Sequence, residues 1–252
     1  MLIGFLGIGI LLFLTKTRPA ISVKSLLAIS FTGLIIAAHW IMFFEAIKVS
    51  NVSVTLACLA STSLFVAFIE PLFFRRKFLL HEMIFGLIVI GGLYMIFRFE
   101  GRYITGILYS LIAAFLAAIF TVFNGIFIEK HDAKSISFYE MLGGFTGISI
   151  YLIASSQISP DMLAITTSDL IYLLILGLVC TAYAFVVSVE VMKELSPFTV
   201  CISFNLEPVY AIILALLFFG EKERMTVGFY FGALIILFTI FANAYIKNKK
   251  AK

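Results

Sequence analysis

Charged residues are scarce in this chain, and their scarcity excludes most soluble folds. Asp, Glu, Lys and Arg make up 13% of the 252 residues, whereas 62% are hydrophobic and the mean hydropathy is +1.13. Soluble domains carry about 25% charged residues, so most of this chain must face lipid or other buried helices. The net charge of +4 does not indicate nucleic-acid binding, because the basic residues gather between apolar segments.

Cysteine is rare as well, and metal-binding motifs are missing from the sequence. The three cysteines, Cys58, Cys180 and Cys201, lie in separate apolar segments, and no CxxC, HExxH or similar spacing occurs. The sequence therefore predicts neither a disulfide framework nor a metal site, and it indicates no cofactor. The first apolar run also lacks the basic start and small-residue cleavage site of a secretory signal peptide.

Apolar segments fill almost the whole chain. Residues 1–14 would reach only about 21 Å as a helix, against a hydrocarbon core of about 30 Å, and are predicted to form a partial span. Eight fuller spans follow, at 25–47, 53–74, 81–97, 104–128, 136–155, 170–191, 198–219 and 225–246. Because backbone groups in lipid must bond within their own segment, we predict an all-α polytopic membrane protein.

Lysine and arginine predict how these helices are oriented. If the loop at 16–24 is cytoplasmic, 13 of the 18 basic residues fall on the cytoplasmic side and 5 on the other. Cytoplasmic loops carry an excess of Lys and Arg. The sequence therefore predicts a cytoplasmic C-terminus with a basic tail.

An internal repeat divides the chain into two halves. The pattern E-x-x-K occurs at Glu45–Lys48 and again 145 residues later at Glu190–Lys193, and in each place it closes one helix before a short turn. The charge bias puts the two turns on opposite sides, so the copies have inverted topology, as in many secondary transporters. We predict a first repeat at 1–103, incomplete at its N-terminus, and a second repeat at 104–252 that supplies five helices.

A polar interruption lies in the middle of the apolar stretch 198–221. Asn205, Glu207 and Pro208 stand there, where a carboxylate costs about 2.5–3.5 kcal/mol on insertion scales. Proline removes one backbone hydrogen bond and kinks a helix. A polar break at mid-depth favours a binding or transport site, although a carboxylate paired inside the bundle beside a packing kink would show the same pattern.

The repeat aligns this interruption with a polar trio, Ser61, Thr62 and Ser63, in the first half. The trio is predicted to line the same pathway; alternatively, its hydroxyls only bond nearby backbone carbonyls.

Three further side chains are candidates for the pathway wall. His39 and Trp40 lie midway along 25–47, and Tyr183 lies near the middle of 170–191. A histidine can carry a proton, and the rings of Trp and Tyr can line a cavity. Hydrogen bonding or plain packing inside the bundle would also explain each of them.

Other motifs are predicted to be structural. Glu45 and Glu190 stand three residues before Lys48 and Lys193 and are expected to form local ion pairs. Glu70, one turn before Arg75 and Arg76, is expected to pair with them. Glycine pairs four residues apart, at 143/147 and 228/232, are expected to bring helices into close contact.

These motifs resemble the drug/metabolite transporter (DMT) superfamily, and within it the EamA-type permeases. The resemblance is carried by 44–50 and its partner 190–196, by Leu206-Glu207-Pro208, and by the helix end at 218–221. It implies ten helices in two inverted five-helix repeats that work by alternating access, of which about nine, one of them partial, are expected here. Ser63 stands where family members usually carry proline, which argues against equal kinks in the two halves.

The sequence thus predicts a secondary transporter that moves a small metabolite or drug-like solute across the bacterial inner membrane, with export as the expected direction. Glu207 is predicted to contact the solute or to couple transport to protons. Two alternatives stay open: an integral membrane enzyme acting on lipid, for which no nucleophile, base or metal cluster is visible, and a non-transporting membrane partner protein. The sequence indicates neither the substrate nor the oligomeric state.

Overall fold

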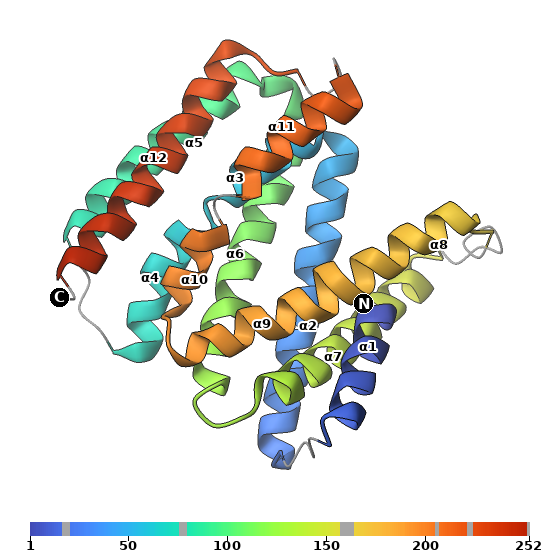
Figure 1. The fold of residues 1–252 in the computed structure, drawn as a ribbon. Coiled ribbons are helices and arrows are strands. Elements are labelled where there is room, and N and C mark those ends of the chain that lie inside the picture. Colours follow the sequence, from blue (N-terminus) through green and yellow to red (C-terminus); the bar gives the residue numbers. More distant parts are fainter. Residues whose placement is uncertain (17–20, 76–79, 157–163, 205–206, 221–223, 251–252) are drawn as a thin grey trace. The chain divides into compact units, whose positions relative to one another are not determined.

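The computed structural model describes residues 1–16, 21–75, 80–156, 164–204, 207–220 and 224–250, and their regular structure is helical throughout (Figure 1). The all-α prediction is therefore confirmed. By length and composition, five helical segments among the described residues can each cross a membrane: Val23–Val49, Val52–Phe74, Gly101–Phe127, Ala133–Ala154 and Thr167–Lys193. The shorter apolar helices include Leu2–Leu14 and Val227–Thr239.

The chain forms two compact units, and each draws on both halves of the sequence. Unit 1 comprises Met1–Ala38 and Phe123–Ser196, and unit 2 comprises His39–Val122 and Pro197–Lys252. Two long helices, α2 (Val23–Val49) and α6 (Ile104–Phe127), contribute to both units.

Unit 1 is built around α7 (Ala133–Ala154), which packs against α1 (Leu2–Leu14). The carboxylate of Asp132 starts α7 by accepting from the backbone N–H of Ser135 at 3.2 Å. On the α2 side the backbones touch, since a Cβ added to Gly143 would clash with the carbonyl of Ser30. Close contact at the 143/147 glycine pair is thereby confirmed.

A second long run completes unit 1. It consists of α8 (Thr167–Leu174), the π-helical segment η3 (Ile175–Tyr183), α9 (Ala184–Glu190) and the short turn η4 (Val191–Lys193). Thr166 and Asp169 start α8 with a capping box, in which each side chain accepts from the other residue's backbone N–H. At its far end Lys193 bonds Glu190 at 2.6 Å. The equivalent pair in unit 2, Lys48 and Glu45, lies at 2.7 Å, so both predicted ion pairs are confirmed.

In unit 2, α5 (Leu80–Phe99) and α12 (Val227–Lys250) lie side by side (Figure 1). They run antiparallel, because Gly92 contacts Gly232 while Phe99, further along α5, contacts Gly228, which comes earlier in α12. A Cβ added to Gly92 would lie 2.9 Å from the carbonyl oxygen of Gly232. The predicted close contact at 228/232 is confirmed, and only glycine fits this crossing.

Two predicted spans of unit 2 are each described as a pair of helices. The first pair is α3 (Val52–Leu59) and α4 (Thr62–Phe74), and the second is α10 (Pro197–Phe204) and α11 (Glu207–Phe219). The outer ends of the two pairs correspond at a spacing of 145 residues, and in the first pair a turn at residues 60–61 separates α3 from α4. Residues 205–206, between α10 and α11, lie outside the described part of the chain, so the expectation of unequal kinks stays a prediction.

The helix ends after these pairs also correspond. Arg75 closes α4 with φ 52°, and 145 residues later Gly220 follows α11 with φ 58°. A left-handed residue is the usual helix terminator, and glycine adopts it without the Cβ clash that arginine suffers. The first half therefore has the same left-handed helix end with arginine, a less suitable residue than glycine.

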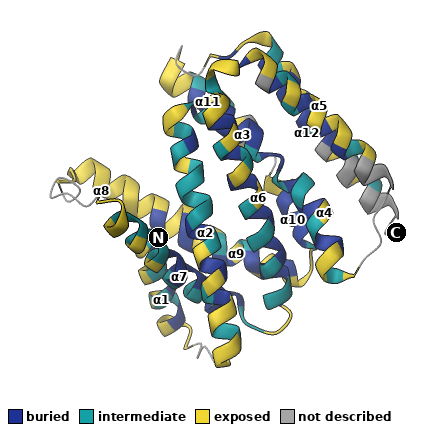
Figure 2. Ribbon diagram, turned by 180° about the vertical axis from the view of Figure 1, so that it is seen from behind, coloured by how far each residue is buried: buried dark blue, intermediate teal, exposed yellow. Residues whose placement is uncertain are grey.

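The two helix pairs lie against each other in antiparallel fashion. α11 packs against α3, and α10 packs against α4 (Figures 1 and 2). Because the first segment of each pair meets the second segment of the other, the two pairs run in opposite directions. The start of α4 and the described start of α11 therefore come to the same level, as expected for inverted repeats.

Candidate functional site

The break between α3 and α4 is held by the predicted polar trio. The hydroxyl of Ser61 donates to the carbonyl of Cys58 at 2.7 Å, Thr62 donates to Leu59 at 2.7 Å, and Ser63 donates to Ala60 at 3.1 Å. Each bond spans three residues, so the hydroxyls serve carbonyls at the point where the regular ladder stops. Hydroxyl groups are a known way to satisfy backbone freed by a helix break inside a membrane.

These bonds confirm one of the two interpretations of the trio, in which the hydroxyls bond nearby backbone carbonyls. Ser61 and Ser63 are buried, whereas Thr62 is half-buried. Thr62 starts α4, and its counterpart 145 residues later is Glu207.

Glu207 is the first described residue of α11, at the middle of the predicted span 198–219, and Pro208 follows it. Asn205 and Leu206 lie outside the described residues.

One exposed stripe of α11 begins at Glu207. Tyr210 and Leu214 lie three and seven residues further on, so they share a helix face with Glu207, and both are about half exposed, at 54% and 49%. Figure 2 shows α11 largely in the exposed colour. Ala215, at 3% exposure, lies on the buried side of the same helix.

Two buried glutamates of unit 2 accept hydrogen bonds from backbone N–H groups far away in the sequence. Glu70 of α4 is 2% exposed and accepts a hydrogen bond from the backbone N–H of Phe198 at 3.0 Å. Phe198 is the second residue of α10, and such N–H groups have no partner within their own helix. A side chain of the first half thus caps a helix of the second half. Arg76 lies outside the described residues, so the pairing of Glu70 with Arg75 and Arg76 stays a prediction.

Glu100 accepts a comparable backbone hydrogen bond beside α12. Its carboxylate, 1% exposed, accepts from the backbone N–H of Thr226 at 2.8 Å, just before α12 begins, and Arg102 lies 3.4 Å from its second oxygen. Nearby, the Asn51 amide approaches the sulfur of Met225 at 3.6 Å. Each of these contacts joins loops that the charge pattern puts on one side of the membrane.

His39 and Trp40 also belong to unit 2. The Nδ1 atom of His39 lies 2.8 Å from the carbonyl oxygen of Ala113, and its ring packs against Phe120 with centroids 5.5 Å apart. The reading of His39 as a hydrogen-bonded bundle residue is therefore supported. The Trp40 ring packs edge-on to Phe44 at 6.2 Å, and both His39 and Trp40 are half-buried.

Tyr183 lies in unit 1, at the end of the π-helical segment η3, and is 67% exposed. Thr181 marks the wider turn with a hydroxyl bond to the carbonyl of Leu176, five residues back. π-helical turns occur often at functional sites. The sequence reading placed Tyr183 on a regular helix, because nothing in its apolar pattern distinguishes the two helix types.

The structure also brings forward an acid that sequence reasoning missed. Glu140 of α7 is fully buried, although its neighbours in sequence gave no sign of a polar site. Its position in the second turn of an apolar helix could have been noticed from the sequence, as Glu207 was. Among the described residues, no group of three or more His, Cys, Asp and Glu side chains could hold a metal ion.

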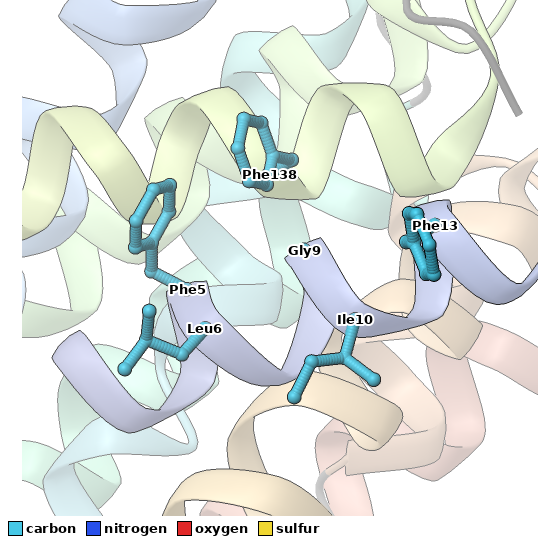
Figure 3. Close-up of a pocket in the computed structure, with 6 residues that line it drawn as sticks. All are labelled: Phe5, Leu6, Gly9, Ile10, Phe13 and Phe138. Carbon is cyan, nitrogen blue, oxygen red and sulfur yellow. The ribbon is translucent and has the colours of Figure 1, made fainter.

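A groove of about 310 Å³ lies beside α1 in unit 1 (Figure 3). It is lined by Phe5, Leu6, Gly9, Ile10 and Phe13 of α1 and by Phe138 of α7. None of these side chains carries a polar atom, and Phe5 packs against Phe138 with ring centroids 4.7 Å apart. Such a lining suits apolar chains and gives no means of recognising a polar solute.

Comparisons with known proteins agree with this arrangement. The chain is 27% identical over 188 residues to an uncharacterized transporter of Clostridium kluyveri, which covers 69% of this chain and 59% of the relative. The chain thus spans less than two thirds of that relative's length. A protein known from a crystal structure has the same fold, with TM-score 0.68 and 12% identity over 97% of this chain and 84% of its own.

A family model matches nearly the whole chain, in two parts. It describes the EamA-like transporter family and matches residues 1–98 and 104–245. The helical fold and the apolar helices make the protein a multi-pass membrane protein, and the family is one of transporters. The chain belongs to the EamA-like transporter family, within the drug/metabolite transporter superfamily.

Proposed function

We propose that this protein is a secondary transporter that exports a small metabolite or drug-like solute across the bacterial inner membrane. It works by alternating access between two inverted repeats, 1–103 and 104–252, and its C-terminus is cytoplasmic. The observation that carries the proposal is the antiparallel packing of α3 and α4 against α11 and α10, which brings the starts of α4 and α11 to one level. The substrate sites of many secondary transporters lie between inverted repeats near mid-depth.

Glu207 is the residue proposed to contact the solute. A carboxylate on an exposed helix face at mid-depth is too costly to leave in lipid, so the face that carries Glu207 and Tyr210 lines a water-filled pathway. Thr62, its counterpart in the first half, offers a hydroxyl at the opposite break. Trp40 and His39 are proposed to contribute to the wall of the pathway in the same unit. Tyr183, in unit 1, stays a prediction of the sequence.

Transport in proteoliposomes tests the proposal. Influx and efflux of a panel of amino acids, organic cations and neutral drugs are measured with and without a pH gradient. We expect Glu207→Gln to lower transport at least tenfold while the protein stays folded, because it removes the one charge at the breaks. Glu129→Gln is the matched control, since Glu129 is exposed in the loop between α6 and α7, and it should transport like the wild type.

Two outcomes would contradict the proposal. Wild-type rates in Glu207→Gln would remove Glu207 from the pathway. If the wild-type protein moved no solute of the panel, while turning over a lipid substrate in the same liposomes, the membrane-enzyme alternative would replace the transporter.

A further inference from the structure

Unit 1 contains a buried carboxyl group whose oxygens have no hydrogen-bond partner. Glu140 is 0% exposed, and within the described part of the chain neither Oε1 nor Oε2 is hydrogen-bonded. The Asn124 side chain of α6 lies against this carboxyl group. Asn124 is 2% exposed, and its Oδ1 also lacks a partner of acceptable geometry. The two carboxyl oxygens and the amide oxygen are thus buried without a hydrogen-bond partner of acceptable geometry.

An ionised carboxylate in this position would be very unfavourable. Burial of an isolated charge costs far more than burial of a neutral group, and a buried charge needs a partner or a bound cation. A neutral carboxyl group carries one O–H, which can donate to an acceptor oxygen. A single proton on Glu140 removes the charge, and its O–H can donate to Oδ1 when the Asn124 amide presents that end to the carboxyl group.

The packing around Glu140 favours a proton over a larger cation. A Cβ on Gly33 of α2 would clash with the Glu140 carbonyl, and a Cβ on Gly143 would clash with that of Ser30. The buried hydroxyl of Ser137, one turn earlier on α7, is the other side chain here without a hydrogen-bond partner in the described structure. Backbones in contact leave little room for the six or more oxygen ligands that a metal cation such as Ca²⁺ takes.

The elements packed against α7 carry few groups that could compete for this proton. α1 has no titratable side chain; its neighbour Met1 contributes an α-amino group. The other titratable groups on α2, α6, α7, η3 and α9 in this unit are Lys24, Lys134, Tyr139, Tyr151, Cys180, Tyr183 and Glu190. Glu190 is paired with Lys193, and none of the others bonds to Glu140 within the described residues.

We propose that Glu140 and Asn124 form a proton-binding site, in which the Glu140 O–H donates to Oδ1 of Asn124 and the proton is released during the transport cycle. The site lies seven residues into α7, about 10 Å from its start. The proposal rests on the proposed transport function, for which it names the coupling ion and its binding residue.

Infrared titration of the purified protein tests the site without any solute. A protonated carboxyl group gives a C=O band that shifts in D₂O. We expect the wild type to show this band, Glu140→Gln to lose it, and Glu129→Gln to keep it. Asn124→Leu should shift the frequency of this C=O band, because the acceptor of the O–H is removed. If Glu140→Gln does not fold, Asn124→Leu tests the site in its place. The absence of the band in the wild type, or its persistence unchanged in either Glu140→Gln or Asn124→Leu, would overturn the proposal.

A sodium arm and a transport arm complete the experiment. If added NaCl removes the band at constant pH, the site binds sodium and the proton assignment is wrong. In proteoliposomes, Glu140→Gln should keep solute exchange without a gradient but lose accumulation driven by a pH gradient. Accumulation at the wild-type level in Glu140→Gln would overturn the coupling role. Loss of all transport by the wild type would instead contradict the proposed function, while the infrared result would still stand.

Discussion

The two helix pairs of unit 2 differ in the chemistry at their middle. In the first, three hydroxyls bond the carbonyls beside the turn between α3 and α4, and no charge is present. In the second, Glu207 and Pro208 stand at the described start of α11. The charge is confined to one half, and we propose that recognition of a solute is the function that distinguishes the two halves.

The two broken helices also differ in which one supports the other. Glu70 of the first caps α10 of the second, and Glu100 holds Thr226 at the start of α12. Both carboxylates come from the first half and both N–H groups from the second. The first half thus provides the structural anchors, while the second carries the exposed acid at the break.

Removal of an anchor should have the largest effect. Glu70→Ala leaves the buried N–H of Phe198 without this acceptor, and we expect a loss of about 3–5 kcal/mol, the cost of breaking a buried charged contact. Thermal or denaturant unfolding in detergent measures it. Glu70→Gln keeps an acceptor oxygen at the same place and should lose much less. Equal losses in Glu70→Gln and Glu70→Ala would show that the cap itself contributes little.

Removal of the hydroxyls should have a smaller effect. Ser61→Ala, Thr62→Ala and Ser63→Ala combined remove three hydrogen bonds, each contributing roughly 0.5–1.5 kcal/mol, and we expect a loss of about 2 kcal/mol.

Ser110→Ala is the matched control for the triple variant. Its buried hydroxyl bonds the carbonyl of Gly106 four residues back within the unbroken helix α6, and that carbonyl keeps its usual helical partner. Ser110→Ala should therefore lose less free energy of unfolding than the triple variant. Equal losses would mean that the three hydroxyls have no special role between α3 and α4.

The smallest expected effect concerns the ends of the two broken helices. Arg75→Gly should stabilise the protein by about 0.5–1 kcal/mol, because glycine adopts the left-handed conformation without a Cβ clash. Gly220→Ala, the reverse change in the other half, should destabilise by about 1 kcal/mol. Unfolding of the two variants under identical conditions compares them. If both changes had the same sign, the two ends would not be equivalent.

Much of this fold could be predicted from the sequence. Hydropathy identified the spans, and the E-x-x-K spacing of 145 residues located the counterparts of the second break. Proline was no guide to the turn between α3 and α4, where Ser63 stands at the position equivalent to Pro208. Such a turn depends on which groups satisfy its carbonyls, and several residue types can do so.

The contacts that hold the arrangement together were beyond the reach of sequence reasoning. Glu70 and Phe198 are separated by 128 residues, and Glu100 and Thr226 by 126. No local pattern links such partners, so Glu70 was assigned to its neighbouring arginines. Glu140 could have been noticed as an acid in an apolar helix, but its burial could not have been predicted, because it follows from the close approach of α2 and α7 at Gly33 and Gly143.

Accessibility of the two breaks tests most directly whether they line one solute pathway. Cysteine is introduced at the counterparts Thr62 and Glu207, one at a time, in a variant whose Cys58, Cys180 and Cys201 are replaced by serine. We predict that both thiols react with a membrane-impermeant maleimide and that a transported solute slows both reactions. Ala215→Cys, on the buried side of α11, should stay unreactive. Reaction at neither break, or protection of only one by the solute, would contradict a shared pathway.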